Sequence, residues 1–129
     1  MAMDKMSKNQ IWEKVKALRG TVVHTIERGN PNLITEVTDT LARRRRPGSG
    51  ADMASYAFDW EVYNTYCYAM DRGMVTGDDF PKVPGARPGG RNGRFILALL
   101  VAAVPEHIEA FRRSEEPSRP GKSGIRRRA

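Results

Sequence analysis

Four consecutive arginines, Arg43 to Arg46, are the residues of this chain with the clearest chemistry. A guanidinium group is planar and permanently charged, and it can bind two phosphate oxygens through parallel hydrogen bonds. Neighbouring side chains on a strand point to opposite faces, so an edge strand or a hairpin tip would let all four reach a polyanion. The run therefore predicts contact with nucleic acid. Two alternatives are a charged edge that blocks sheet aggregation and a surface for an acidic protein partner.

Two further groups of basic residues could extend this contact. Residues 81–93 hold three prolines and four glycines and should form a loop beside the start of a helix, whose N-terminal amides favour anions. Residues 114–129 are rich in Ser, Pro, Gly and Arg, and we expect a disordered basic tail there. The predicted nucleic-acid-binding residues are Arg43, Arg44, Arg45, Arg46, Lys82, Arg87, Arg91, Arg94, Arg126, Arg127 and Arg128.

The chain contains no catalytic motif that we can assign. Gly85 and Gly90 have the glycine spacing of a P-loop, but Arg91 and Asn92 replace the lysine and hydroxyl residue that would bind nucleotide and magnesium. The two histidines have no Cys or His neighbour at a zinc-binding spacing. We therefore expect a protein that is not an enzyme and that uses no metal or cofactor.

Aromatic residues are concentrated between residues 56 and 68. Exposed rings could stack on nucleic acid bases. Their helical spacing instead favours a place in the core or in a protein interface for most of them. These residues are Tyr56, Phe58, Trp60, Tyr63, Tyr66 and Tyr68.

The overall charge favours a phosphate-bearing partner. The formal net charge is +7, yet residues 51–80 hold one arginine against six acidic residues, so the basic groups form separate clusters. Cys67 is the only cysteine, which excludes an intrachain disulfide and indicates a reducing, cytoplasmic location. The longest apolar run has ten residues, Phe95 to Val104, whereas a membrane span needs about 20. We expect no membrane association.

The elements that must position these residues form an α+β fold. We expect a flexible N-terminus over residues 1–9 and one domain over residues 10–113. The pattern predicts an N-terminal helix, a three- or four-stranded antiparallel meander, and two or three C-terminal helices packed on one face. The helix over residues 95–104 is apolar around its whole circumference and should be the central core element. A further short helix is expected over residues 105–111.

The N-terminal pattern Trp12-x-x-Val15-x-x-Leu18-x-Gly20-Thr21-Val22 is followed by two β-prone runs, an aromatic helix and an apolar helix that ends in Val-Pro. This order resembles a small bacterial α+β domain found in uncharacterised proteins and accessory modules. The resemblance covers residues 11–108 and implies the order of elements, without any catalytic residue. In that family the third strand alternates apolar residues, and this chain has arginines there.

We therefore expect a small nucleic-acid-binding protein, with DNA the expected form, that uses an arginine-rich hairpin, a basic loop and a basic tail. The alternative is an interaction or inhibitor protein of a mobile element. Such a protein would dock on a protein partner, or on a second copy of itself, through the arginine edge and the aromatic helix.

Overall fold

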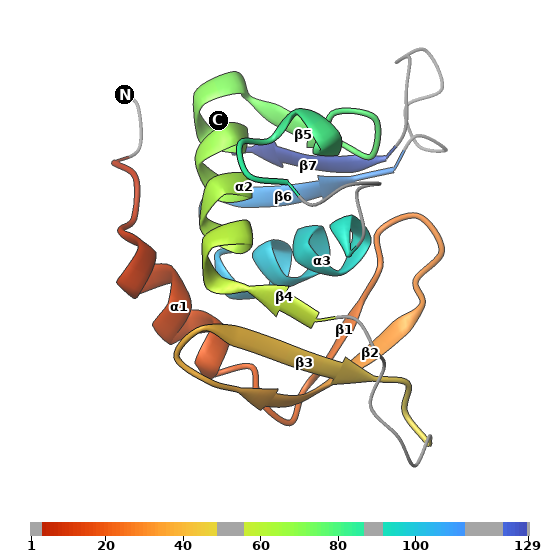
Figure 1. Cartoon of the computed structure of the whole chain (residues 1–129). Helices are drawn as coiled ribbons and strands as arrows, with labels where there is room; N and C mark the ends of the chain where they lie inside the picture. The colour runs from red at the N-terminus through yellow and green to blue at the C-terminus, as the bar shows by residue number, and fades with distance from the viewer. Residues whose placement is uncertain (1–3, 49–55, 87–91, 113–122, 129) are drawn as a thin grey trace.

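The computed structural model of the chain describes residues 4–48, 56–86, 92–112 and 123–128 (Figure 1). These residues form helices and two antiparallel sheets, which confirms the α+β class. The helices are α1 (Lys8–Lys16), α2 (Asp59–Arg72), α3 (Gly93–Ala103) and the short 3-10 helix η1 (Phe80–Lys82). The first sheet contains β1 (Val22–His24), β2 (Pro31–Val37), β3 (Leu41–Arg45) and β4 (Tyr56–Phe58). The second sheet contains β5 (Met74–Thr76), β6 (Ile108–Phe111) and β7 (Gly124–Arg127).

The strands of the first sheet follow one another in chain order, β1-β2-β3-β4. β3 is therefore an internal strand. Its Arg44 pairs with Ile34 of β2 on one side, and its Arg43 pairs with Tyr56 of β4 on the other. β4 pairs with β3 only from Leu41 to Arg43, so the expectation of an edge strand is wrong for Arg43. Among the described residues, Arg44 and Arg45 pair with β2 alone, and Arg46 follows the strand.

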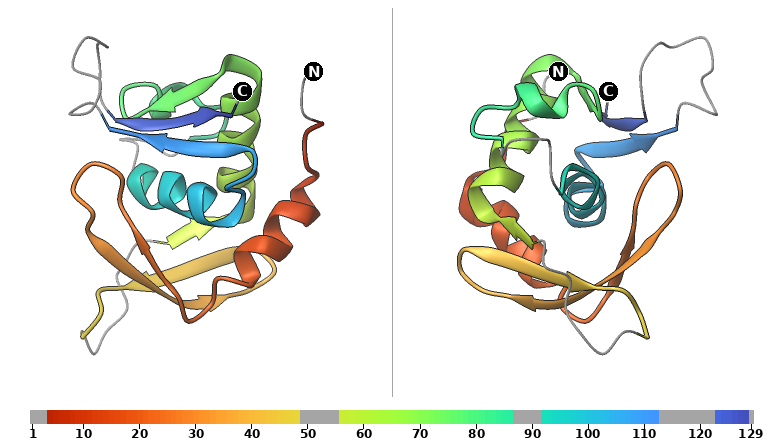
Figure 2. Two further views of the ribbon diagram at one scale, coloured as in Figure 1. Left: turned by 180° about the vertical axis from the view of Figure 1, so that it is seen from behind. Right: turned by 45° about the vertical axis from the view of Figure 1, so that its right-hand side comes forward.

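α3 lies between the two sheets, as the right-hand view of Figure 2 shows. Every residue from Phe95 to Leu100 is at most 5% exposed, which confirms the prediction that this apolar helix is the centre of the core. The helix contacts β1 of the first sheet and both β6 and β7 of the second. Most apolar side chains of α3 are thus removed from water, as its sequence requires, while Ala102 near its end is exposed.

α2 joins the two sheets and packs along α3. It begins directly after β4 and ends at Gly73, whose left-handed backbone (φ 93°) lets the chain turn at once into β5. At its start, the Glu61 carboxylate accepts a hydrogen bond from the Phe58 backbone N–H (3.1 Å) and satisfies a donor that the helix leaves unpaired. No helix in the described part of the chain is long and apolar enough to cross a bilayer.

The C-terminal part of the chain differs from the sequence prediction. Residues 108–111 form strand β6 instead of a short helix, and residues 124–127 form β7 instead of part of a disordered tail. β7 is the middle strand of the second sheet and pairs with both β5 and β6. Ile125, the one apolar side chain of this segment, is fully buried, and a Cβ at Gly124 would clash with the Val75 carbonyl oxygen. β7 is therefore held by backbone hydrogen bonds to β5 and β6, and the amino-acid composition of residues 114–129 did not predict this strand.

The start of the chain also differs from the predicted flexible segment. α1 begins at Lys8, and Ser7 caps it through a reciprocal pair of hydrogen bonds with Gln10. The Met6 backbone N–H donates to the Tyr66 hydroxyl of α2 (2.9 Å), and Lys5 forms an ion pair with Asp71. The predicted packing of helices on one face of one sheet is replaced by a helix between two sheets.

Ile125→Ala should lower the free energy of unfolding by about 2 to 5 kcal/mol, because the side chain is fully buried in the middle strand of the second sheet. Lys82→Ala, an exposed substitution, should change it by less than about 0.5 kcal/mol. Equilibrium urea unfolding measures both. Equal midpoints for the two variants would mean that the C-terminal strand does not contribute to the folded domain.

Candidate nucleic-acid interface

The strand geometry of β3 divides the arginine run between two faces. Ala42 is fully buried and points toward the core, and Arg44 shares its side of the sheet. Arg43 and Arg45 point to the opposite side. The side of the first sheet away from α3, which carries Arg43 and Arg45, is called the outer face below. Arg46 follows the strand and is exposed.

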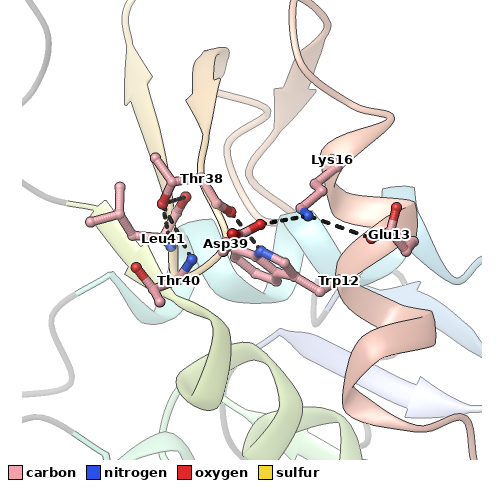
Figure 3. A network of polar contacts seen from close by, with 7 residues as sticks. All are labelled: Trp12, Glu13, Lys16, Thr38, Asp39, Thr40 and Leu41. Carbon is pink, nitrogen blue, oxygen red and sulfur yellow. Dashed lines mark hydrogen bonds and ion pairs between the residues drawn. The ribbon is translucent and has the colours of Figure 1, made fainter.

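A network at the β2–β3 turn fixes the position of β3 (Figure 3). The Thr38 hydroxyl accepts hydrogen bonds from the backbone N–H groups of Thr40 (3.2 Å) and Leu41 (3.1 Å), which holds the turn closed. The Trp12 indole N–H of α1 donates to the Thr38 carbonyl oxygen (2.7 Å). Lys16 of α1 pairs with Asp39 (2.8 Å). The hydrogen bond in this pair raises the pKa of Lys16 and lowers the pKa of Asp39.

Arg44 makes contacts inside the protein instead of pointing to solvent. Its guanidinium donates to the side-chain oxygens of Asn32 (2.8 Å) and Asn92 (3.2 Å) and lies 4.8 Å from the centre of the Phe95 ring. Burial, with a smaller effect from the charge of Arg46, lowers the pKa of Arg44. Asn92 in turn donates to the Tyr56 carbonyl oxygen (2.9 Å). Arg44 therefore ties the first sheet to the start of α3.

The other three arginines of the run place positive charge on or beside the outer face. Arg43 has one ion pair, with Glu36 at 3.5 Å, and both side chains remain partly exposed. Arg45 and Arg46 form no ion pair with any carboxylate in the described residues. None of the described helices packs on the outer face (Figures 1 and 2). This part of the surface carries positive charge that the fold leaves uncompensated.

Three aromatic rings lie in contact along one side of this face. The Arg43 guanidinium lies 5.5 Å from the Tyr56 ring centre, Tyr56 meets Phe58 edge to face (5.2 Å), and Phe58 stacks on Trp60 (5.7 Å, 13° between the planes). The rings of Tyr56, Phe58 and Trp60 are called the aromatic row below. The sequence predicted that most of the aromatic residues lie in the core or in a protein interface. Tyr66 is fully buried, as expected, whereas Trp60 is 36% exposed.

The direct step from β4 into α2 creates the aromatic row. Tyr56 and Phe58 are two residues apart on a strand and share one face, since the residue between them, Ala57, is buried. Trp60 follows in the first turn of α2 and reaches back to the Phe58 ring. The spacing 56-58-60 was visible in the sequence, but only the position of the strand-to-helix junction shows that the three rings form one surface.

The basic loop is described at its two ends. Lys82 and Arg94 are exposed and form no ion pair with a described residue, while Arg87 and Arg91 lie outside the described residues. A Cβ placed at Gly85 would lie 3.2 Å from the Trp60 ring, so the loop backbone passes close to one end of the aromatic row. At the other end Asn92 contacts the Tyr56 carbonyl. Arg94 thus lies on α3, two residues after a residue that touches both β3 and β4.

The third predicted basic cluster belongs to the second sheet, on the other side of α3. Arg126 pairs with Glu109 (2.8 Å), and Arg128 pairs with the same carboxylate (3.0 Å). Arg127 donates to the Met70 carbonyl oxygen (2.5 Å). These arginines hold β7 against β6 and α2. The three basic clusters of the sequence are therefore not all on one face.

The polar pair of the buried Tyr66 and the half-buried His107 connects elements far apart in the sequence. The Tyr66 hydroxyl lies 2.8 Å from His107 Nδ1 and also accepts the Met6 backbone N–H. Burial raises the pKa of Tyr66, so its hydroxyl stays protonated beside His107. Tyr66 is fully buried, and this pair joins the N-terminal segment, α2 and the turn before β6. Among the described residues no group of three His, Cys, Asp or Glu side chains could hold a metal ion.

Comparison of the chain with protein-family models, with characterised proteins and with solved structures gives no match. The candidate interface is therefore supported by the chemistry of its residues. One sheet face combines guanidinium groups that have no described carboxylate partner with partly exposed aromatic rings.

Arg44→Ala should lower the free energy of unfolding by about 1 to 3 kcal/mol, because it removes charged hydrogen bonds and leaves two buried or half-buried asparagine oxygens without their donor. Arg45→Ala, one position along the same strand, should change it by less than about 0.5 kcal/mol. Thermal and urea unfolding compare the two variants directly. If Arg45→Ala is the more damaging change, the assignment of the two faces of β3 is reversed.

Proposed function

We propose that the protein binds nucleic acid, with DNA the expected form, through the outer face of the first sheet, and that it does so without catalysing a reaction. Arg43, Arg45 and Arg46 provide the phosphate contacts. Arg94, exposed in the first turn of α3 and two residues after Asn92, adds a further positive charge at the start of that helix. RNA is a second form that fits the same phosphate chemistry.

The observation that carries this proposal is the contrast between two groups of arginines. Arg126 and Arg128 share the Glu109 carboxylate, so each of them has an acidic partner within the fold. Arg45 and Arg46 have no such carboxylate among the described residues. Keeping two adjacent guanidinium groups uncompensated costs free energy through their mutual repulsion, and that cost is offset when a polyanion binds.

Phosphate binding by these residues would follow the usual electrostatics of nucleic acid. Each guanidinium can hold a phosphate through two hydrogen bonds, and each neutralised phosphate releases condensed counterions. Arg43 is stacked on Tyr56, and its pair with Glu36 is long and partly exposed, so a phosphate can replace that carboxylate at little cost. Binding should therefore weaken steeply as the salt concentration rises.

The same surface fits a second candidate function, docking on an acidic protein partner. The exposed indole of Trp60 beside arginine favours it, because Trp and Arg are the residues that most often dominate protein interfaces. This alternative predicts no binding to nucleic acid even at low salt, and that result separates it from the first proposal.

Replacing Arg43, Arg45 and Arg46 together by Gln should weaken DNA binding and reduce the slope of log affinity against log salt by about 1 for each phosphate that the variant no longer neutralises. Arg44 is left intact because it supports the fold. Fluorescence anisotropy with labelled DNA at about 50 and 200 mM salt measures affinity and slope.

A matched control removes the same charge elsewhere by replacing three exposed arginines outside β3, Arg19, Arg28 and Arg72, by Gln. The control should retain most of the affinity. Equal reductions of affinity in the two triple variants would show that binding follows net charge alone and that the outer face is not the site.

A further inference from the structure

We infer that the nucleic acid bound by this face is single-stranded, and that Trp60 stacks on an unpaired base while the β3 arginines hold the backbone phosphates. This inference rests on the proposed function and narrows it to one class of ligand. Three features carry it: the aromatic row, the internal position of β3, and the placement of the charges relative to the rings.

The aromatic row offers flat apolar surface where a base could lie. Trp60 is 36% exposed, and its ring is nearly parallel to that of Phe58. Tyr56 and Phe58 are partly exposed on the outer face. Bases of a duplex are already stacked on one another inside the helix, so they have no free face on which an aromatic side chain of the protein could stack. Unpaired bases have free faces, and stacking on an aromatic side chain is favourable for every base type.

The position of β3 argues against insertion into a groove of duplex DNA. Strands that read a duplex groove do so as a projecting two-stranded ribbon. β3 lies between β2 and β4 in a four-stranded sheet and pairs with β4 from Leu41 to Arg43. The β2–β3 turn is held against α1 by Trp12 and Lys16, and it carries Asp39 and no arginine. The arginines instead lie on and beside a sheet face. A sheet face that carries aromatic side chains is a common platform for unstacked bases.

The β3 arginines and the aromatic row are arranged to fit a single nucleic acid strand that lies across the sheet. Arg43 touches the Tyr56 ring, and Arg45 is on the same face of β3, so the phosphate-binding groups lie beside the row. The acidic residues near this surface are each paired, Glu36 with Arg43 (3.5 Å) and Asp59 with Lys8 (3.6 Å). A nucleic acid strand whose bases stack on the aromatic row would place its phosphates toward Arg43 and Arg45.

The test compares labelled oligothymidylate of about 20 nucleotides with a mixed-sequence duplex of the same length, both at low salt. Oligouridylate is the third probe and distinguishes RNA from DNA. The expected result is at least about tenfold tighter binding of a single strand than of the duplex. Trp60→Ala should weaken single-strand binding about 5- to 100-fold, the range expected when one base no longer has a ring to stack on, and should leave duplex binding unchanged.

Two matched variants control for changes in folding. Trp60→Phe keeps an aromatic ring and should retain most of the affinity. Tyr68→Ala removes a ring that is also stacked on an arginine, Arg72 (5.2 Å), but that lies outside the row, and it should bind like the unaltered protein. Oligothymidylate should also quench the tryptophan fluorescence of the unaltered protein, and the quenching should disappear in Trp60→Ala, because the other tryptophan, Trp12, is only 5% exposed.

The outcomes separate the inference from the proposal on which it rests. Equal or tighter binding of the duplex, with no effect of Trp60→Ala, would overturn the single-strand inference and leave nucleic acid binding intact. Absence of binding to all three probes by folded protein would overturn both.

Discussion

The burial of α3 is the constraint on which the rest of the structure depends. A helix that is apolar on every side cannot lie on the surface of one sheet, because half of its side chains would face water. Here the first sheet covers one side, the second sheet covers the other, and α2 runs along it from β4 to β5. The C-terminal strand β7 is needed for the same reason, since it is the middle strand of the second sheet and contacts the helix.

Covering α3 determines which side chains of the first sheet are available for binding. The inner face must meet the helix, and the charged side chain of Arg44 on that face is held by Asn32, Asn92 and the Phe95 ring. Strand alternation then sends Arg43 and Arg45 to the outer face, where they lie beside aromatic rings. The same geometry that turns one arginine into a structural residue leaves its two neighbours on the outer face, where we propose that nucleic acid binds.

The sequence was sufficient to predict the elements with strong local signals. The α+β class, the apolar core helix and the glycine at the end of α2 follow from hydrophobic periodicity and from backbone preference. The second sheet could not be predicted, because β7 has a single buried apolar side chain and is held by pairing with strands distant in sequence. The sequence also could not predict that Arg44 supports the fold while Arg45 lies on the outer face, because these positions depend on which side of β3 meets α3. The aromatic row required knowledge of where β4 ends.

The most direct test of the central claim is a map of the contacted surface by NMR. Oligothymidylate titrated into isotopically labelled protein should shift the Trp60 indole resonance and the backbone amides of β3 and β4, and should leave the buried Trp12 indole and the amides of β5, β6 and β7 unchanged. Shifts confined to the second sheet around Arg126 and Arg128 would contradict the claim that the outer face of the first sheet is the binding surface.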